Sequence, residues 1–296
     1  MKTSTQRTPV QLTLLSSILG EDFPLALERQ RATGLRFLDL KDGLWGQSIE
    51  QLSLEVAGRA ASLIREAGLA VHCFSTSIGH IPLEANTDEA AFRARYDAAL
   101  NNTLQVANIM CPQVIRLLAP RLSGAKGQLA VARLQREFPY IIGVYREWVD
   151  RIAAAGFGVL IENEARGCVL GSVDDVLAFF EALNRPATAR YTWDVQNLWQ
   201  SGTFPTLEVY HQLRPVMGAL HLKGGRANER GELQWAVPLN EASWPVLDIV
   251  RAVVSDGVAP FICLNPSHGE KPPGWNGWEV AQREIAFLRR EIKEIA

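Results

Sequence analysis

Four short apolar segments of the sequence each lead into a side chain that can bind a divalent cation. The four candidates are Glu162 after VLI, Asp194 after YTW, His221 after AL and Asn265 after FICL. A mixed set of carboxylate, imidazole and amide ligands suits Mn, Mg, Co, Fe or Zn. Singly, each has an ordinary explanation, because a carboxylate at a strand end often caps the next helix and a lone histidine is usually packed. Their equivalent positions on successive segments favour one shared metal ion.

Two of the neighbouring side chains could take part in proton transfer. Lys223 follows His221 by two residues, so both would point to the same face of a strand. A lysine beside a cation can have a lowered pKa, and it could act as an acid or bind a substrate oxygen. Glu162 is the candidate base as well as a ligand, with Glu164 in its place if the strand extends further. An ordinary surface lysine is the alternative for Lys223.

Four further side chains are candidates for binding substrate. Arg116 ends a strand-like segment and Arg226 follows the one that holds His221, and either guanidinium could bind a hydroxyl, carboxylate or phosphate. Trp199 follows a segment end, where an aromatic face could pack on a sugar. His72 lies within a segment and could face inward. The alternatives are surface ion pairs for the arginines, lid packing for Trp199 and core packing for His72.

These residues must be positioned by an alternation of short apolar segments and longer helical ones. We predict eight strands, at residues 12–17, 35–40, 70–75, 114–118, 158–162, 189–194, 218–223 and 260–264. Several are near-continuous hydrophobic runs, as expected for parallel strands that are covered on both faces.

The gaps between the strands carry helical periodicity. Helices are predicted at residues 48–66, 87–107, 129–155, 172–183, 206–213, 244–254 and 278–292. Ser48 with Gln51 forms a capping-box pattern for the first of these, and Pro139 should break or kink the third. Glycines that should end helices precede the strands at positions 34, 68, 156 and 257.

Eight strand–helix units in this order predict a single (β/α)8 barrel domain over residues 1–296. An open doubly wound sheet is the runner-up, but it more often has about five to seven strands, and no GxGxxG follows the first strand. On a barrel, the carboxyl ends of the strands face the active site. The polar insertions at residues 224–239 and 266–277 would lie at the same mouth.

The composition of the chain limits the kinds of partner that it could bind. Its net charge is -2 and it has no basic run, which weighs against nucleic acid as a partner. The four cysteines form no CxxC pair and are expected to be free thiols. The polar amino terminus lacks the apolar core of a signal peptide, and no run has the length of a membrane helix. We expect a cytoplasmic protein that binds a small polyol or sugar, with no membrane partner, as a homodimer or homotetramer.

The strings IENE, TWDVQN and HLKGG, in this order, resemble the metal-site strands of the xylose-isomerase-like superfamily, and LRFLDLKDGLWG extends the resemblance to the second strand. The superfamily includes sugar and sugar-phosphate isomerases, ketose epimerases, inosose dehydratases and endonuclease IV type nucleases. In its epimerase-like members, a Glu, an Asp, a His and a second Glu hold one divalent metal. The resemblance, which covers most of the chain, implies Glu162, Asp194 and His221 as the first three ligands.

The fourth position departs from this pattern, because Asn265 stands where the family has its second Glu. An amide oxygen can still bind a metal, but it cannot serve as a base. In the epimerases that second Glu is also a base, so the departure counts against two-carboxylate epimerisation. His268 or Glu270 could supply the missing ligand or acid–base group.

Together these features predict a metal-dependent isomerase or epimerase of a sugar, sugar phosphate or related polyol. The reaction would proceed by proton abstraction and an enediolate, whose charge the metal would stabilise. A dehydratase of an inosose-type substrate shares the same first step. A non-catalytic sugar-binding barrel is a further alternative. An endonuclease IV type phosphodiesterase is disfavoured, because it needs a histidine-rich zinc cluster and the chain has five histidines.

Overall fold

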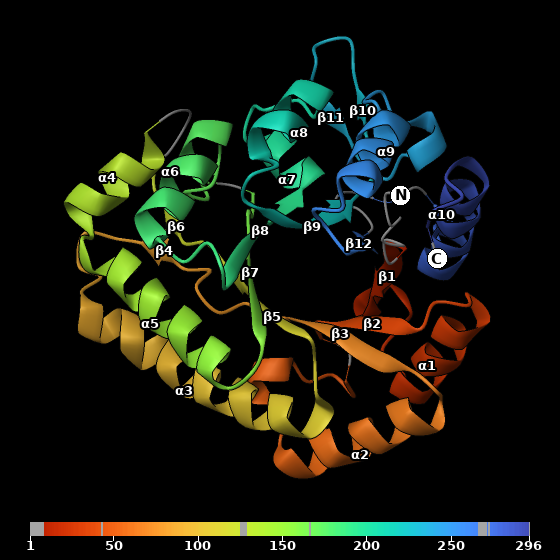
Figure 1. Cartoon of the computed structure of the whole chain (residues 1–296), viewed down its shortest axis with the longest axis horizontal. Coiled ribbons are helices and arrows are strands. Elements are labelled where there is room, and N and C mark those ends of the chain that lie inside the picture. Colours follow the sequence, from red (N-terminus) through yellow and green to blue (C-terminus); the bar gives the residue numbers. More distant parts are fainter. Residues whose placement is uncertain are drawn as a thin grey trace, which may run out of the picture.

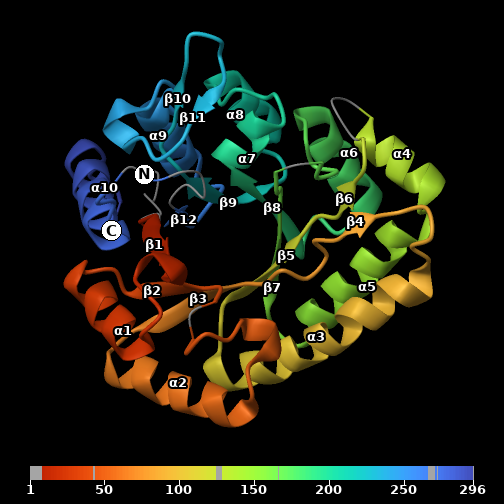
Figure 2. The ribbon, with the colours of Figure 1, turned by 180° about the vertical axis from the view of Figure 1, so that it is seen from behind.

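The computed structural model describes residues 9–42, 44–124, 129–165, 167–265, 271 and 273–295. Eight parallel strands form a closed barrel in the order β1-β12-β9-β8-β7-β5-β3-β2, and helices surround it (Figures 1 and 2). The predicted (β/α)8 barrel is therefore confirmed, and the open doubly wound sheet is excluded. The barrel strands are β1 (Gln11–Leu15), β2 (Phe37–Leu40), β3 (Ala70–Ser75), β5 (Val114–Leu118), β7 (Gly158–Glu162), β8 (Ala189–Asp194), β9 (Met217–Leu222) and β12 (Phe261–Leu264).

All eight predicted strands are present, and β3, β5, β7 and β8 match the predicted bounds at both ends. Two pairs of very short strands lie outside the barrel and were not predicted. β4 (Pro82–Leu83) pairs in parallel with β6 (Arg121–Leu122), and β10 (Arg226–Ala227) forms an antiparallel hairpin with β11 (Leu233–Gln234). The hairpin lies within the predicted polar insertion after β9.

The helices that surround the barrel agree with the prediction in most places. They are α1 (Phe23–Ala32), α2 (Leu54–Glu66), α3 (Glu89–Met110), α4 (Ala130–Glu137), α5 (Tyr140–Ala154), α6 (Val173–Leu183), α7 (Val195–Gln200), α8 (Leu207–Leu213), α9 (Val246–Asp256) and α10 (Gly277–Glu291). Pro139 does divide the predicted helix 129–155 into α4 and α5. The four predicted glycine positions 34, 68, 156 and 257 all have positive φ, as helix-ending glycines do.

The predicted start of α2 was wrong. Ser48 precedes a single 3-10 turn, Ile49–Gln51, and its side chain makes no capping hydrogen bond. Leu52 then takes an extended conformation, with φ −64° and ψ 130°, which ends the turn. Ser53 is the true N-cap, because its hydroxyl accepts a hydrogen bond from the backbone N–H of Val56 at 3.2 Å.

Parallel register brings the carboxyl ends of neighbouring strands level with one another. Asp194 on β8 pairs with His221 on β9, and His221 in turn pairs with Cys263 on β12. On the other side, Glu162 ends β7 opposite Leu118 of β5. The fold thus gathers polar residues from successive strands at one mouth of the barrel.

All four cysteines are free, and Cys73, Cys168 and Cys263 are buried, in agreement with the expectation of unpaired thiols. Within the described ranges, none of the helices combines the length and apolar character needed to cross a membrane.

Candidate metal and substrate site

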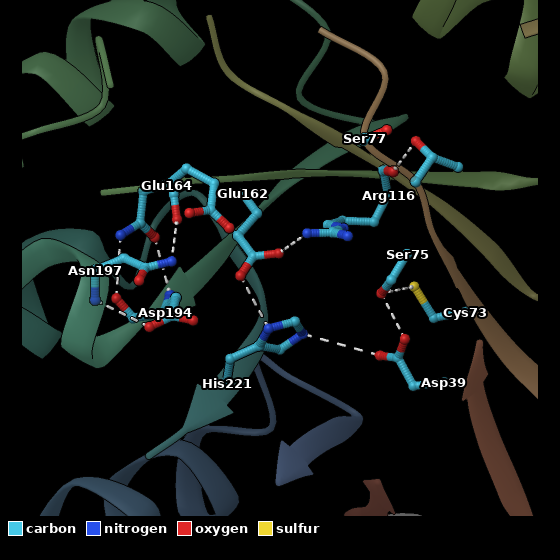
Figure 3. Close-up of polar contacts among 12 residues, drawn as sticks. Asp39, Cys73, Ser75, Ser77, Arg116, Glu162, Glu164, Asp194, Asn197 and His221 are labelled. Carbon is cyan, nitrogen blue, oxygen red and sulfur yellow. Dashed lines mark hydrogen bonds and ion pairs between the residues drawn. The ribbon is translucent and has the colours of Figure 1, made fainter. Parts of the chain in front are cut away.

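The structure brings the three principal ligand candidates together. One ligand atom from each of Glu162, Asp194 and His221 lies within 4.8 Å of the others. All three side chains are buried, and Figure 3 shows them pointing toward one another from β7, β8 and β9. We call these three residues the ligand cluster. Such spacing allows one cation to contact all three.

Glu162 is held as an anion by its neighbours. Its Oε2 accepts a short hydrogen bond from Nη1 of Arg116, and its Oε1 lies 3.0 Å from Nδ1 of His221. Burial by itself raises the pKa of Glu162, but the Arg116 guanidinium and His221 outweigh it and hold the pKa well below its usual range. A carboxylate with so low a pKa is a good ligand and a poor proton acceptor.

Asp194 is fixed by two sets of donors. Its Oδ1 accepts hydrogen bonds from the backbone N–H groups of Gln196 and Asn197, at 3.1 and 3.0 Å, and so caps α7. Its Oδ2 lies 2.6 Å from Nζ of Lys223. Burial raises the pKa of Asp194 to about 6, since the attraction of Lys223 only partly offsets it and Glu162 adds repulsion.

Sequence reasoning missed Asn163, which locks the ends of β7 and β8 together. Its Oδ1 accepts hydrogen bonds from the Tyr191 hydroxyl at 2.7 Å and from the backbone N–H of Asp194 at 2.9 Å. Its Nδ2 donates to the carbonyl of Asp194 at 3.1 Å. An asparagine between two glutamates gives no periodic signal, so only the fold identifies this role.

His221 lies between two acidic side chains. While Nδ1 faces Glu162, Nε2 is 3.9 Å from Oδ2 of Asp39, whose other oxygen accepts a hydrogen bond from Ser75 at 2.5 Å (Figure 3). Burial lowers the pKa of His221, but the attraction of Glu162 and Asp39 raises it by more, so the pKa lies above its usual value. If a cation binds Nδ1, the nearby carboxylate of Asp39 would favour the remaining proton on Nε2.

The donor set fits a divalent cation. Among the described residues, Oδ1 of Asn265 is buried without a hydrogen-bond partner, whereas Nδ1 of His221 and Oδ2 of Asp194 have only their close contacts with Glu162 and Lys223. Buried polar atoms are normally satisfied, and a cation would satisfy them here. Because Arg116 and Lys223 already balance two carboxylates, a divalent ion would leave the site with surplus positive charge. Such a site favours substrates that develop negative charge.

Asn265 follows β12, where its backbone N–H donates to the carbonyl of Leu222 at 3.1 Å. With Lys223 it lines a cavity of about 40 Å³ that lies between the ends of β9 and β12 and helix α10. At the α10 side, both carboxyl oxygens of Glu284 accept from the backbone N–H of Leu239, at 3.2 and 3.1 Å. Burial raises the pKa of Glu284 to about 7. The candidates His268 and Glu270 lie outside the described residues.

Two predicted substrate-binding residues lie away from the cluster. The ring of His72 stacks on Phe261 at 3.5 Å, and its Nδ1 is 3.1 Å from Oε1 of Gln113. Gln113 and Phe261 are at the amino ends of β5 and β12, so His72 is packed at the opposite end of the barrel from the cluster. Arg226 is exposed and pairs with Glu241 at 3.0 Å. His72 therefore packs in the core and Arg226 forms a surface ion pair, so neither is brought to the cluster, and substrate binding by them stays a prediction.

The other two predicted substrate-binding residues lie on the mouth side. Arg116 is buried in contact with Glu162, where its guanidinium stabilises the ionised form of that carboxyl group. Trp199 is on α7, five residues beyond Asp194, and its ring packs edge-on against Phe204 at 4.8 Å.

No protein-family model and no curated protein matches the chain. Solved structures do match. The probable 3-DHS dehydratase AsbF of Bacillus anthracis is 18% identical, with a TM-score of 0.68 over 94% of this chain and 98% of that one. D-allulose 3-epimerase of Methylomonas sp. is 14% identical, with a TM-score of 0.70 over 97% and 99%. A xylose isomerase-like TIM barrel protein of Mycobacterium smegmatis, crystallised with magnesium, is 16% identical, with a TM-score of 0.69 over 96% of both chains.

At these identities the likeness shows the fold. The chain has the fold of the xylose isomerase-like TIM barrels, as the strings IENE, TWDVQN and HLKGG predicted.

Proposed function

We propose that the chain is a divalent-metal-dependent isomerase or epimerase of a sugar, sugar phosphate or related polyol, which it would bind as a small soluble substrate. The observation that carries the proposal is the convergence of Glu162, Asp194 and His221, from three successive strands, within 4.8 Å of one another. The reaction would start with abstraction of a proton from the hydroxyl-bearing carbon next to the substrate carbonyl, to form an enediolate.

The roles of the ligands follow from their surroundings. Glu162, Asp194 and His221 would hold the ion, and Asn265 would offer its unpartnered Oδ1 as a fourth ligand. When bound, a divalent ion would supply Lewis-acid stabilisation of the charge that develops on the substrate oxygens. The magnesium complex of the fold relative supports a hard divalent ion of this kind.

Proton transfer would fall to the side chains that surround the cluster. The low pKa of Glu162 argues for a ligand and against a base. Glu164 lies two residues beyond the end of β7, in the segment that leaves the strand at the mouth, and it is half-buried. We therefore assign proton abstraction to Glu164, in place of Glu162. Lys223 would hold a substrate oxygen or return a proton through its ammonium group.

Dehydration is the second candidate, and the residue at position 265 favours it. Syn-elimination from an inosose-type substrate needs the same proton abstraction but no second carboxylate across the ring. Asn265, whose Oδ1 has no partner among the described residues, occupies the place where the resemblance expects that carboxylate. A probable dehydratase is among the structures that share the fold.

The remaining alternatives have less support. Among the described residues, the two groups that could hold a metal contain only one histidine, His221, whereas a phosphodiesterase of the endonuclease IV type needs several. A sugar-binding barrel without turnover would keep the cluster and lack the exchange reaction described next.

The test combines metal analysis with proton exchange. The purified chain is loaded with Mn²⁺, and fructose, ribulose, their phosphates and inososes are followed by NMR in deuterated water. Deuterium at a carbon next to the carbonyl supports the proposal, and the new product distinguishes isomer, epimer and alkene. His221→Asn should lose both metal and exchange, while Arg226→Met is the matched control outside the cluster. Retained metal without exchange on any substrate would refute the catalytic proposal.

A further inference from the structure

A surface groove of about 620 Å³ is lined by residues that follow β8 and β9 along the chain, and it has no role in the proposed chemistry. Its lining is aromatic on both sides, with a few polar groups at the rim. The lining residues are Trp199, Gln200, Gly202, Phe204, Ala227, Gly231, Glu232, Leu233 and Trp235. We call it the aromatic groove.

Two segments form the walls of the groove, one after β8 and one after β9. One wall is α7, which starts directly after Asp194 and includes Trp199 and Gln200. The segment that follows α7 adds Phe204 to this wall. The other wall is the β10–β11 hairpin, which lies after Lys223 in the chain and includes Leu233, and Trp235 directly follows it. Figures 1 and 2 both show α7, α8 and the hairpin grouped on one side of the barrel.

The two walls are fixed to each other close to the cluster. Nε2 of Gln196 donates a short hydrogen bond to the carbonyl of Gly224. Gly225 allows the close approach, because a Cβ there would come within 2.7 Å of Leu233 and 3.3 Å of the Trp199 ring. The groove is therefore a built feature of the two segments that leave β8 and β9.

The spacing of residues along α7 relates the groove to the cluster. Trp199 follows Asp194 by five residues on one helix, which places it about 7.5 Å further along the axis. A sugar ring at the cluster with a second ring attached would extend over this distance.

We propose that the aromatic groove is a second sugar subsite, and that the substrate is a glycosidically linked sugar rather than a free monosaccharide. This inference rests on the proposed function for the identity of the reacting ring. Aromatic faces pack on the apolar faces of pyranose rings, and Phe204, which packs edge-on against Trp199, keeps 37% of its surface exposed in the groove.

The polar lining selects for a neutral ring. Gln200 donates to Asn197 and Glu232 accepts from Asn228, and the amide and carboxylate groups have further capacity to bond to hydroxyls. The described residues that line the groove include no lysine or arginine, so it lacks the cations that a phosphate group would need. A hydroxyl-rich ring fits this chemistry better than a sugar phosphate does.

The test compares binding of ketose-containing disaccharides with that of fructose. The full chain, loaded with Mn²⁺, is titrated by calorimetry with lactulose, maltulose, turanose and fructose. At least one disaccharide should bind about tenfold more tightly than fructose. Phe204→Ala and Trp235→Ala should each reduce that preference about tenfold, while Phe287→Ala, a matched change of a half-buried phenyl on α10, should preserve it.

Three results would overturn the inference. The first is that no disaccharide binds more tightly than fructose. The second is that the groove variants, shown to be folded by their melting temperatures, keep the full preference. The third is that Phe204→Ala changes the oligomeric state on size-exclusion chromatography, which would assign the groove to a second copy of the chain. The proposed function is tested separately, because proton exchange on fructose with no preference for disaccharides would refute only the subsite.

Discussion

Replacement of Arg116 by methionine tests whether the buried cation is what permits a carboxylate inside the barrel. The side chains of Arg116 and Glu162 are only 4% and 2% exposed. Methionine has a similar length and no charge, so it removes the ion pair without opening a large cavity. Breaking a buried pair leaves an uncompensated charge and costs about 3–5 kcal/mol. For a chain of this size, that corresponds to a fall in Tm on the order of 10 °C.

Arg226→Met is the matched control. Arg226 also pairs with a glutamate, Glu241, but the two side chains are 46% and 53% exposed. An exposed pair of this kind contributes less than about 1 kcal/mol, so the control should melt close to the wild type.

The Arg116→Met experiment is repeated with and without metal and at several pH values. Melting is followed by circular dichroism with EDTA and with Mn²⁺, since a bound cation would replace the lost charge and restore part of the stability. The Arg116 guanidinium holds the pKa of Glu162 low in the wild type. In the variant this pKa should rise, so the deficit should shrink as the pH falls and Glu162 takes up a proton. If Arg116→Met melts like Arg226→Met in EDTA at neutral pH, the argument from the buried ion pair is wrong.

Three further predictions follow from the same site. Because burial raises the pKa of Glu284 to about 7, its folded form binds a proton more tightly than the unfolded chain does, so the wild type should lose up to about 3 kcal/mol as the pH rises from about 4.5 to 7. Urea titrations of Glu284→Gln should show this loss abolished, and an unchanged pH profile would contradict the assignment. The pKa of Asp194, about 6, predicts that Mn²⁺ affinity measured by calorimetry weakens below about pH 6, and equal affinity at pH 5 and 7.5 would contradict it. Asn265→Glu should tighten Mn²⁺ binding about tenfold by adding a charged ligand, and weaker binding would place position 265 outside the site.

The strands could be predicted from sequence because parallel strands covered on both faces are apolar runs, and their ends are marked by the polar residues of the mouth. Glu162 and Asp194 are such markers, and β7 and β8 end at them. Once the strands were placed, the barrel followed from their number, and the ligand cluster followed from the common level of their carboxyl ends.

Helices with buried polar residues could not be predicted in the same way. In α1 the apolar stripe includes Gln30, which is fully buried because its Nε2 donates to the backbone carbonyls of Leu35 and Phe37. In α7 five consecutive residues, from Val195 to Trp199, are buried, and two of them, Gln196 and Asn197, are polar, so polarity does not mark the exposed side of the helix. Hydrophobic periodicity predicts a helix only where one face is exposed to solvent.

The contacts of individual side chains also could not be predicted from the sequence. Arg116 and Arg226 have the same residue type and both were expected to bind substrate, yet one is buried against Glu162 and the other is paired with Glu241 at the surface. Sequence gives the strand on which a residue lies, but not the neighbour that the barrel brings to it. The role of Asn163, which depends on Tyr191 and Asp194, was hidden for the same reason.

Metal stoichiometry in a single set of variants tests the central claim most directly. The purified chain, stripped and then dialysed against Mn²⁺, is analysed by plasma mass spectrometry beside Glu162→Gln, Asp194→Asn and His221→Asn, singly and combined, with circular dichroism to verify folding. We expect one ion per chain in the wild type, less in each single variant and none in the triple variant. A folded triple variant that retains a full equivalent of manganese would contradict the account.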